Sequence, residues 1–321
     1  MDKIYDMIII GGGPGGYTAA LYGARAGLEP LIIEKMSAGG QVALTDQIDN
    51  YPGFEEGIDG FSLGEKMKQA AEKFGAKTEF ATVLSVDLKA DSKVVRTAKE
   101  IFYGKTVIIS TGADPRELGI PEERQLIGRG VSYCASCDGM FYRGKTVVVV
   151  GGGNTAAADI MALRRIAARV LVVHRRDTLR ASKIYHQSLM NAENVEFYWN
   201  SKVSEILTDD SARDGSVSVS SQGGKVTGVR IRNLKTGDER ALTCDGIFVA
   251  IGRKPASELV AGQLALDEGG YIEADESTRT SLPGVYAVGD VRTKAVRQVI
   301  TAAADGAVAA HYAEEYLVEK A

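Results

Sequence analysis

The sequence predicts an α/β fold in which one strand–helix–strand unit occurs twice. Two segments match without a gap, Met7–Lys35 and Val147–Arg175. Each opens with four apolar residues, which indicates a buried strand, and continues with a glycine cluster and a stretch rich in Ala and Leu. A second apolar run then completes each unit. At 321 residues, the chain is long enough for two domains that each bury their own core.

The composition is that of an ordinary globular protein, with 45% hydrophobic and 25% charged residues. The net charge of −4 gives no reason to expect a nucleic-acid surface. No apolar run approaches the roughly 18 to 20 residues that a membrane span requires. The first apolar run leads directly into glycines, which favours a buried strand over a secretory signal. Three cysteines do not make a disulfide scaffold, so we expect a reducing cytoplasm.

The two glycine clusters predict dinucleotide binding. In such a unit the first glycine permits a tight turn, the second lets the backbone approach a pyrophosphate, and the third position lets helix and strand pack closely. The helix that follows offers unpaired N–H groups and a partial positive charge to the phosphates. The three positions are Gly11, Gly13 and Gly16 in the first copy, and Gly151, Gly153 and Ala156 in the second.

The two copies differ where the second strand ends. Glu34 lies 23 positions after Gly11, and His174 lies 23 positions after Gly151. A carboxylate at this place accepts hydrogen bonds from ribose hydroxyls and repels a 2′-phosphate, which suits FAD or NAD. The second copy instead has Arg175 and Arg176 after His174, with Arg180 close behind, and such a cluster can grip a 2′-phosphate. The alternative for the basic cluster is a solvated loop.

The stretch "SYCASCDGMFYRG" places Cys134 and Cys137 three positions apart, with Asp138 directly after. A zinc site normally needs four ligands, and the remaining candidates are Cys244 and three scattered histidines. A redox pair fits better, because one helical turn between the cysteines can close a reversible disulfide. Asp138 is then placed to give or take a proton as general acid or base, although a turn or helix cap is its alternative.

With these motifs the chain resembles the bacterial low-molecular-weight thioredoxin reductases over nearly its whole length. The cysteine block and the basic cluster are specific to that group within the larger class of flavin reductases. The matching segments are "GGGPGGYTAALYGARAGL", "GGQ", "NYPGF", "STGADPR", "GRGVSYCASCDGMFYRGK", "GGGNTAAAD", "HRRDTLRASK", "FVAIGRKP" and "SLPGVYAVGDV". One departure is Ala157-Ala158-Asp159, where the family often has two acids, and it could shift the affinity for NADPH.

The resemblance implies two Rossmann-like dinucleotide-binding domains of the three-layer ββα type, with the second inserted in the first. The FAD domain would comprise residues 1–113 and 246–321. The NADPH domain would comprise residues 114–245 and carry the cysteines. The connections near Ala113–Leu118 and Cys244–Ile247 would form a hinge.

The predicted cofactor contacts lie in the glycine clusters, at the ends of apolar strands and at the start of the C-terminal helix. An acid at the end of a strand can accept a hydrogen bond from a ribityl hydroxyl, and a helix N-terminus stabilises negative charge on a reduced flavin. For FAD the residues are Gly11, Gly13, Pro14, Gly15, Gly16, Glu34, Lys35, Gly40, Gln41, Asn50, Val83, Thr111, Gly112, Ala113, Gly289, Asp290, Arg297, Gln298 and Val299. For NADPH they are Gly151, Gly153, Asn154, Thr155, His174, Arg175, Arg176 and Arg180.

The implied activity is the reduction of thioredoxin. A hydride would pass from NADPH to FAD, and the electrons would then open the disulfide between Cys134 and Cys137. By the resemblance, Cys137 faces the flavin and forms the transient adduct with its ring, and Cys134 attacks the disulfide of thioredoxin. Rotation of the NADPH domain would let nicotinamide and disulfide meet the flavin in turn, whereas a fixed arrangement that uses both flavin faces is the alternative. A cytoplasmic homodimer is also implied.

Three other functions compete with this one. The reductase of a peroxidase system normally carries an extra N-terminal thioredoxin-like region, which we do not expect here because the chain starts close to its first strand. A flavin reductase that serves ferredoxin or a quinone would have no cysteine pair. A redox-sensing protein without turnover would not need the cysteine pair, the acid and the basic cluster together. The Ser/Gly-rich stretch Asp209–Lys225 is expected to be an edge hairpin without chemistry.

Overall fold

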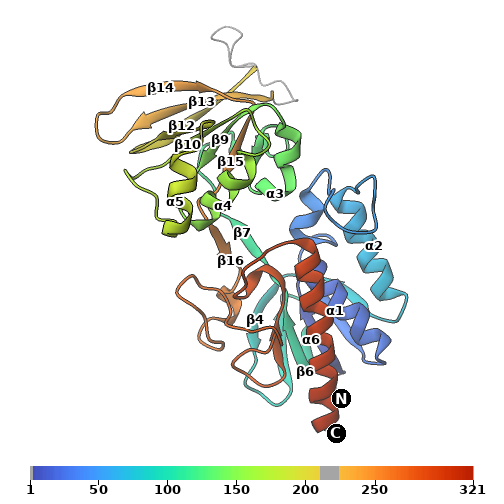
Figure 1. The fold of residues 1–321 in the computed structure, drawn as a ribbon. Helices are drawn as coiled ribbons and strands as arrows, with labels where there is room; N and C mark the ends of the chain where they lie inside the picture. The colour runs from blue at the N-terminus through green and yellow to red at the C-terminus, as the bar shows by residue number, and fades with distance from the viewer. Residues whose placement is uncertain (1–2, 210–223, 321) are drawn as a thin grey trace. The chain divides into compact units, whose positions relative to one another are not determined.

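The computed structural model describes residues 3–209 and 224–320, so most of the predicted hairpin at Asp209–Lys225 lies outside the described residues. The chain divides into two compact units. The first joins Met1–Asp114 with Lys254–Ala321, and the second is Pro115–Arg253 (Figure 1). A chain that enters a second unit and then returns has the inserted arrangement that the sequence analysis predicts.

The first unit is built on a seven-stranded sheet in the order β3-β2-β1-β6-β5-β4, with β17 also paired to β6. Its strands are β1 (Ile4–Ile10), β2 (Pro30–Glu34), β3 (Lys77–Phe80), β4 (Val83–Asp87), β5 (Lys93–Thr97), β6 (Ile101–Ile109) and β17 (Val285–Ala287). Its helices are α1 (Pro14–Arg25), α2 (Gly60–Glu72) and α6 (Val299–Lys320), with 3-10 turns η1 (Gly40–Leu44), η5 (Glu258–Val260) and η6 (Gly289–Val291). The strands β3, β2, β1, β6 and β17 run parallel, whereas β4 and β5 are antiparallel.

The second half of β1, Met7–Ile10, is wholly apolar because both of its faces are buried. Successive side chains of a strand point to opposite faces, so alternate residues of β1 enter different cores. Ile9 packs on the helix side in a cluster with Tyr17 of α1. Ile8 packs on the other side in a cluster with Val95 of β5. The first unit therefore has three layers: helices lie on one face of the parallel strands, and β4 and β5, which continue the sheet from β6, pack over the other face (Figure 1).

Helices α1 and α6 lie side by side in this unit (Figure 1) because small residues line their contact. A Cβ added at Gly306 of α6 would lie 2.2 Å from the backbone oxygen of Gly15 in α1, so no side chain fits there. Pro14 occupies the first turn of α1, where its missing N–H costs no hydrogen bond. The close approach fixes the start of α1 against the C-terminal helix.

The second unit repeats the three-layer plan. A five-stranded parallel sheet runs in the order β11-β10-β9-β15-β8 and a three-stranded antiparallel sheet in the order β12-β13-β14. The strands are β8 (Val131–Ser132), β9 (Thr146–Val150), β10 (Arg169–Val173), β11 (Val195–Tyr198), β12 (Ser201–Thr208), β13 (Val226–Asn233), β14 (Glu239–Thr243) and β15 (Gly246–Val249). The helices are α3 (Ala135–Asp138), α4 (Asn154–Leu163) and α5 (Lys183–Met190), with 3-10 turns η2 (Glu123–Leu126) and η3 (Gly139–Tyr142).

As in β1, successive side chains of β9 enter two different cores. Val149 packs with Ala156 of α4 on the helix side, and Val148 packs with Val229 of β13 on the other side. The predicted α/β fold with two Rossmann-like units is therefore confirmed. Within the described part of the chain, no helix is both long and apolar enough to cross a membrane.

The chain passes between the units in two short strands, β7 (Ala113–Pro115) and β16 (Arg253–Pro255), which pair with each other. The first passage lies at the predicted place. The second lies later than the predicted Cys244–Ile247, because β15 pairs with β9 and β8 and so completes the sheet of the second unit. Residues 246–253, which the resemblance had given to the first domain, therefore lie in the second compact unit.

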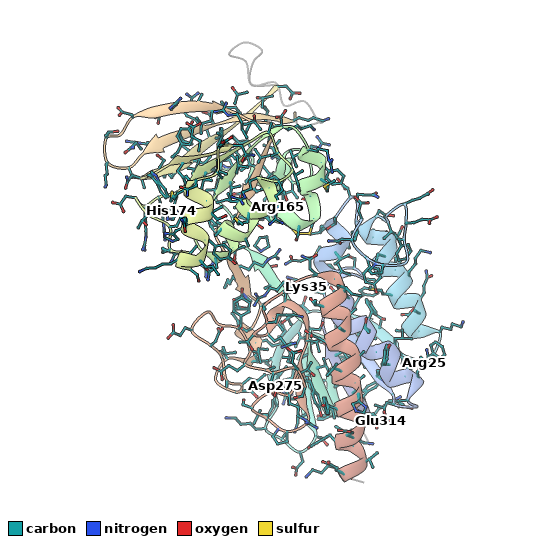
Figure 2. All side chains as sticks on the ribbon, viewed as in Figure 1. Arg25, Lys35, Arg165, His174, Asp275 and Glu314 are labelled. Carbon is teal, nitrogen blue, oxygen red and sulfur yellow. A yellow bond between two sulfur atoms is a disulfide. The ribbon has the colours of Figure 1, made fainter. Side chains whose placement is uncertain are left out.

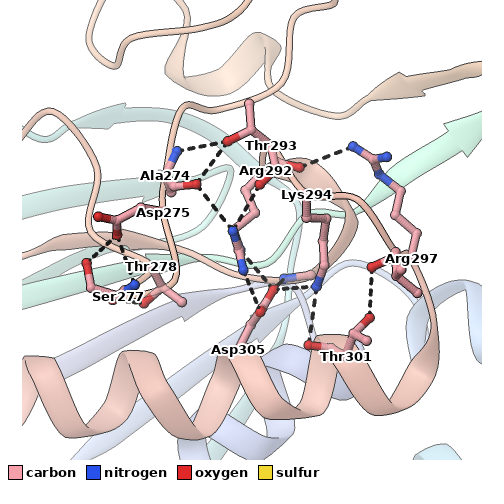
Figure 3. A network of polar contacts seen from close by, with 12 residues as sticks. Ala274, Asp275, Ser277, Thr278, Arg292, Thr293, Lys294, Arg297, Thr301 and Asp305 are labelled. Atoms are coloured by element: carbon pink, nitrogen blue, oxygen red, sulfur yellow. Dashed lines mark hydrogen bonds and ion pairs between the residues drawn. The ribbon is translucent and has the colours of Figure 1, made fainter. Parts of the chain in front are cut away.

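A buried ion cluster joins α6 to the segment that follows β17 (Figure 3). Asp305 of α6 is 7% exposed and accepts hydrogen bonds from Arg292, at 2.8 and 3.0 Å, and from Lys294, at 2.7 Å. The backbone N–H of Gly289 donates to the same carboxylate at 2.8 Å. Burial alone would raise the pKa of Asp305, but the hydrogen bonds from Arg292 and Lys294 outweigh it and hold the pKa below its ordinary value. The carboxylate thus fixes the turn that carries Gly289 and Asp290.

We expect Asp305→Asn to lower the free energy of unfolding by about 3–5 kcal/mol, because it leaves two buried cations without their counter-charge. The measurement is urea unfolding at pH 7, with Glu315→Gln as control. Glu315 is also on α6, but its ion pair with Arg279 is half-exposed, so its loss should lower that free energy by no more than about 1 kcal/mol.

The pH dependence gives a second check on Asp305. Its pKa is depressed in the folded state, so the stabilisation is present above the pKa of an unfolded Asp, about 3.9. It is lost as the pH falls through the lower, folded pKa. The difference between the wild type and Asp305→Asn should therefore persist from pH 7 to about pH 4 and shrink below it. Equal losses in Asp305→Asn and Glu315→Gln at pH 7 would contradict this account.

Candidate active site

Cys134 and Cys137 form a disulfide bond at the start of α3, with their Cα atoms 5.3 Å apart. Cys134 is the N-cap residue of this short helix, and its carbonyl oxygen accepts the N–H groups of Cys137, at 3.3 Å, and Asp138, at 3.1 Å. One helical turn therefore brings the two sulfurs together, as the spacing predicts. Within the second unit Cys137 is exposed and Cys134 is half-buried. A disulfide that solvent can reach is open to thiol–disulfide exchange.

The side chain of Asp138 points back toward the strand that precedes the disulfide. Ser132, at the end of β8, donates its hydroxyl hydrogen to Asp138 Oδ2 over 2.6 Å. The same hydroxyl oxygen accepts the N–H of Cys134 at 3.1 Å. Asp138 thus lies within one hydrogen-bonded link of the backbone of Cys134. Asp138 is therefore held in the same turn as the redox cysteines.

A buried carboxylate on η2 holds the residue before Cys134. Glu123 accepts the hydroxyl of Tyr133 at 2.8 Å and the backbone N–H groups of Leu118, at 2.9 Å, and Gly119, at 3.0 Å. It therefore connects the segment after β7 to the redox segment. Neither Glu123 nor Ser132 was predicted from the sequence, because their roles depend on which turns fold onto β8.

Cys244 takes no part in the disulfide. Its side chain is buried, and burial raises the pKa of its thiol to about 12. A thiol with such a pKa stays protonated and unreactive near neutral pH. Among the described residues, no cluster of His, Cys, Asp and Glu has the arrangement of a metal site.

The glycine turn of the first unit leaves room for a phosphate. Gly11 has a φ of +105°, and a Cβ there would lie 2.4 Å from the carbonyl oxygen of Ser110. At Gly13, the N-cap of α1, an added Cβ would meet only the carbonyl oxygen of Gly39, at 4.0 Å. No side chain caps α1, so its first N–H groups face an open side of the turn. These features fit a bound dinucleotide.

Glu34 lies at the end of β2 and is fixed against this turn. Its carboxylate accepts the N–H of Gly12 at 2.6 Å and that of Met36 at 3.0 Å. Lys35, directly after it, is exposed. A carboxylate oxygen can accept more than one hydrogen bond, so Glu34 retains capacity for a ribose hydroxyl.

Several other residues predicted to contact FAD lie together in the first unit. Gln41 on η1 donates to the carbonyl oxygen of Ala113 at 3.1 Å, and Asn50 donates to Gln298 at 3.0 Å. Val83 opens β4 and packs against the core on the strand side of the sheet. The remaining predicted residues lie where chain turns leave the sheet: Gly40 on η1, Thr111 and Gly112 after β6, Gly289 and Asp290 on η6, Arg297 with its guanidinium 4.2 Å from the ring centroid of Tyr271, and Val299 at the start of α6.

The second unit has the same kind of turn before α4. Gly151 has a φ of +150°, and nothing lies within 4 Å of a Cβ added at Gly153, the N-cap residue. Asn154, the first residue of α4, accepts the N–H of Ser182 at 2.8 Å, and Thr155 beside it is exposed. No side chain caps α4. The turn is therefore open to a phosphate in the same way as that of the first unit.

The basic cluster divides into two environments. Arg175, Arg176 and Arg180 are exposed, and the backbone N–H of Arg180 donates to the carbonyl oxygen of Gly152 at 2.7 Å. His174, labelled in Figure 2, is by contrast only 4% exposed. Within the described residues its Nε2 has no hydrogen-bond partner. Burial and the charges of the three arginines lower the pKa of His174, so the imidazole is neutral at pH 7.

The imidazole of His174 supports the glycine turn from below. A Cβ at Gly152 would lie 2.4–2.5 Å from three atoms of the ring, so the ring occupies the space that a side chain would need. The ring also makes a T-shaped contact with Trp199, with centroids 6.2 Å apart. Charge to bind a 2′-phosphate is therefore available from the three arginines and not from His174.

Known proteins resemble this chain over its whole length. The family model for pyridine nucleotide-disulphide oxidoreductases matches residues 5–306. A thioredoxin reductase of Streptomyces clavuligerus is 46% identical over 99% of this chain and 95% of its own length. A thioredoxin reductase of Bacillus subtilis is 42% identical over 99% of this chain and 96% of its own length.

Solved structures agree with these relatives. The crystal structure of thioredoxin reductase from Streptococcus pyogenes has a TM-score of 0.89 at 41% identity and covers 99% of this chain and 100% of its own. The thioredoxin reductase of Giardia duodenalis has a TM-score of 0.88 at 35% identity, with the same coverage. The chain therefore belongs to the pyridine nucleotide-disulphide oxidoreductase family and, within it, to the thioredoxin reductases.

Proposed function

We propose that this chain is an FAD-containing thioredoxin-disulfide reductase that uses NADPH. The observation that carries the proposal is the accessible Cys134–Cys137 disulfide with Asp138 beside it, in a unit that also has an open dinucleotide turn. Two such turns in one chain suit a relay between two cofactors. The relatives that share these features over their full length are named thioredoxin reductases.

The two turns would take different cofactors. We assign FAD to the first unit, because Glu34 offers a carboxylate for a ribose hydroxyl and would repel a 2′-phosphate. We assign NADPH to the second unit, because Arg175, Arg176 and Arg180 present three exposed guanidinium groups beside the glycine turn. When bound, the flavin supplies a carrier that takes a hydride from the nicotinamide and delivers two electrons to the disulfide.

The cysteines and the acid carry out the rest of the reaction. Reduction of the Cys134–Cys137 bond takes two electrons and two protons and yields two thiols. The thiolate of Cys134 then attacks one sulfur of the partner's disulfide, and the other partner sulfur leaves as a thiolate. Attack of Cys137 on Cys134 releases the first partner sulfur and restores the Cys134–Cys137 bond. Asp138 takes a proton from an attacking thiol and returns one to a leaving thiolate, so electrons and protons both pass to the partner.

Three further features belong to this proposal. Rotation about the β7–β16 connection would let the nicotinamide and the disulfide meet the flavin in turn. The partner would be thioredoxin or a similar small protein with a disulfide. A cytoplasmic homodimer is the expected assembly, and a reducing compartment is expected because three cysteines do not make a disulfide scaffold.

We expect Cys137→Ser to abolish the reduction of thioredoxin by NADPH, because no internal disulfide can form. Reduction of a small dye that takes electrons from the flavin should continue at a rate close to that of the wild type. The measurement compares the two activities of the purified, FAD-loaded variant. Loss of both activities would count against the relay.

We expect the double change Arg175→Ala with Arg176→Ala to raise the KM for NADPH by about 10- to 100-fold, because the two exposed guanidinium groups together contribute about 1.5–3 kcal/mol of charge-assisted contact with the 2′-phosphate. The KM for NADH should change little, since NADH has no 2′-phosphate. Arg169→Ala is the control, because Arg169 is exposed at the opposite end of β10. Equal effects on both nucleotides would show that the arginines do not read the 2′-phosphate.

A further inference from the structure

The hydroxyl of Ser132 lies between the two groups that the exchange reaction uses. It is buried, with 4% of the residue exposed, and stands 2.6 Å from Asp138 Oδ2. Its oxygen also accepts the N–H of Cys134 at 3.1 Å, and the carbonyl oxygen of Cys134 lies 3.4 Å away. Burial matters here, because water cannot readily replace a hydroxyl that is removed from such a place.

The hydrogen-bond count of a hydroxyl allows Ser132 to serve both protonation states of Asp138. A hydroxyl has one hydrogen and two lone pairs, and the N–H of Cys134 occupies one lone pair. When Asp138 is ionised, the hydrogen goes to the carboxylate. When Asp138 is protonated, its own hydrogen can go to the second lone pair, and the hydroxyl hydrogen can turn to the carbonyl oxygen of Cys134. No buried group is left unpaired in either state.

We propose that Ser132 is a positioning residue that holds the carboxyl group of Asp138 beside Cys134 and sets the pH range in which Asp138 exchanges protons with the redox cysteines. This inference rests on the proposed function, in which Asp138 moves the protons. The hydrogen bond from Ser132 to the ionised carboxylate of Asp138 is charge-assisted, so it is stronger than the hydrogen bond between Ser132 and the protonated acid. Removal of the hydroxyl must therefore favour the protonated form of Asp138.

Apart from the thiols of the redox cysteines themselves, the other titratable groups near Asp138 leave one competitor in the working pH range. Burial raises the pKa of Tyr142 on η3 to about 12, with a further contribution from the charge of Asp138, and burial likewise raises the pKa of Cys244 to about 12. Asp245 also faces Tyr142 and accepts the N–H of Thr146 at 2.9 Å. On α4, which packs against α3, burial raises the pKa of Asp159 to about 6 against the opposing charge of Arg253. The experiment must therefore separate Asp138 from Asp159.

The test is the pH profile of single-turnover thioredoxin reduction by the FAD-loaded enzyme, pre-reduced with NADPH, in the wild type and in Ser132→Ala. One limb of the curve of rate against pH should be absent in Asp138→Asn and therefore reports on Asp138. In Ser132→Ala this limb should move to higher pH by about one unit. The same shift should appear in an Asp159→Asn background. Ser132→Thr keeps a hydroxyl and should restore the wild-type profile.

Ser201→Ala is the matched control for loss of a buried hydroxyl. Ser201 is 5% exposed in the same unit, and its hydroxyl donates to the carbonyl oxygen of Trp199 at 2.9 Å, away from the redox site. This variant should leave the profile unchanged. An active Ser132→Ala whose profile coincides with that of the wild type, or a Ser132→Thr that shifts as far as the alanine variant, would overturn the role of Ser132. Absence of thioredoxin reduction by the wild type at every pH would instead overturn the proposed function, and the inference with it.

Discussion

The structure depends on the close approach of backbone segments at two turns, the one between β1 and α1 and the one between β9 and α4. A Cβ at Gly16 would lie 2.0 Å from the carbonyl oxygen of Gly11, and one at Gly151 would lie 2.3 Å from that of Ala250. Because no side chain fits at these places, each helix starts directly at the edge of its sheet. The uncapped N–H groups then open on the side where a pyrophosphate can bind. Packing and ligand binding therefore impose the same requirement on the same few residues.

The units differ in what fills the space next to that turn. In the first unit a carboxylate, Glu34, bonds to the turn through the N–H of Gly12. In the second unit the neutral ring of His174 fills the space beneath Gly152, and the charge is moved outward to exposed arginines. Under the proposed assignment, one fold would thus present a negative group to FAD and positive groups to NADPH. In this proposal, a difference of a few residues at one strand end decides which nucleotide each unit suits.

Most of the fold could be predicted because short, local sequence patterns indicate its strands and turns. Four-residue apolar runs before glycine clusters identify β1 and β9, and their alternate side chains do enter two separate cores. The second passage between the units was placed too early, since β15 reads as an apolar strand whichever sheet it joins. Its pairing with β9 is a contact between residues about a hundred positions apart, which a local pattern does not encode. The links from Ser132 and Glu123 were missed for the same reason, as they depend on turn geometry.

The proton path constrains the redox site as strongly as the electron path does. A disulfide that opens and closes must gain and lose two protons with each pair of electrons, so an acid nearby is of use only if it is held in place and can change its charge. Asp138 is fixed by a buried hydroxyl that also accepts the N–H of Cys134, and Tyr133 is fixed by Glu123. Residues on both sides of Cys134 are therefore anchored to the body of the second unit. The sulfur atoms can then exchange partners while the backbone that carries them stays in place.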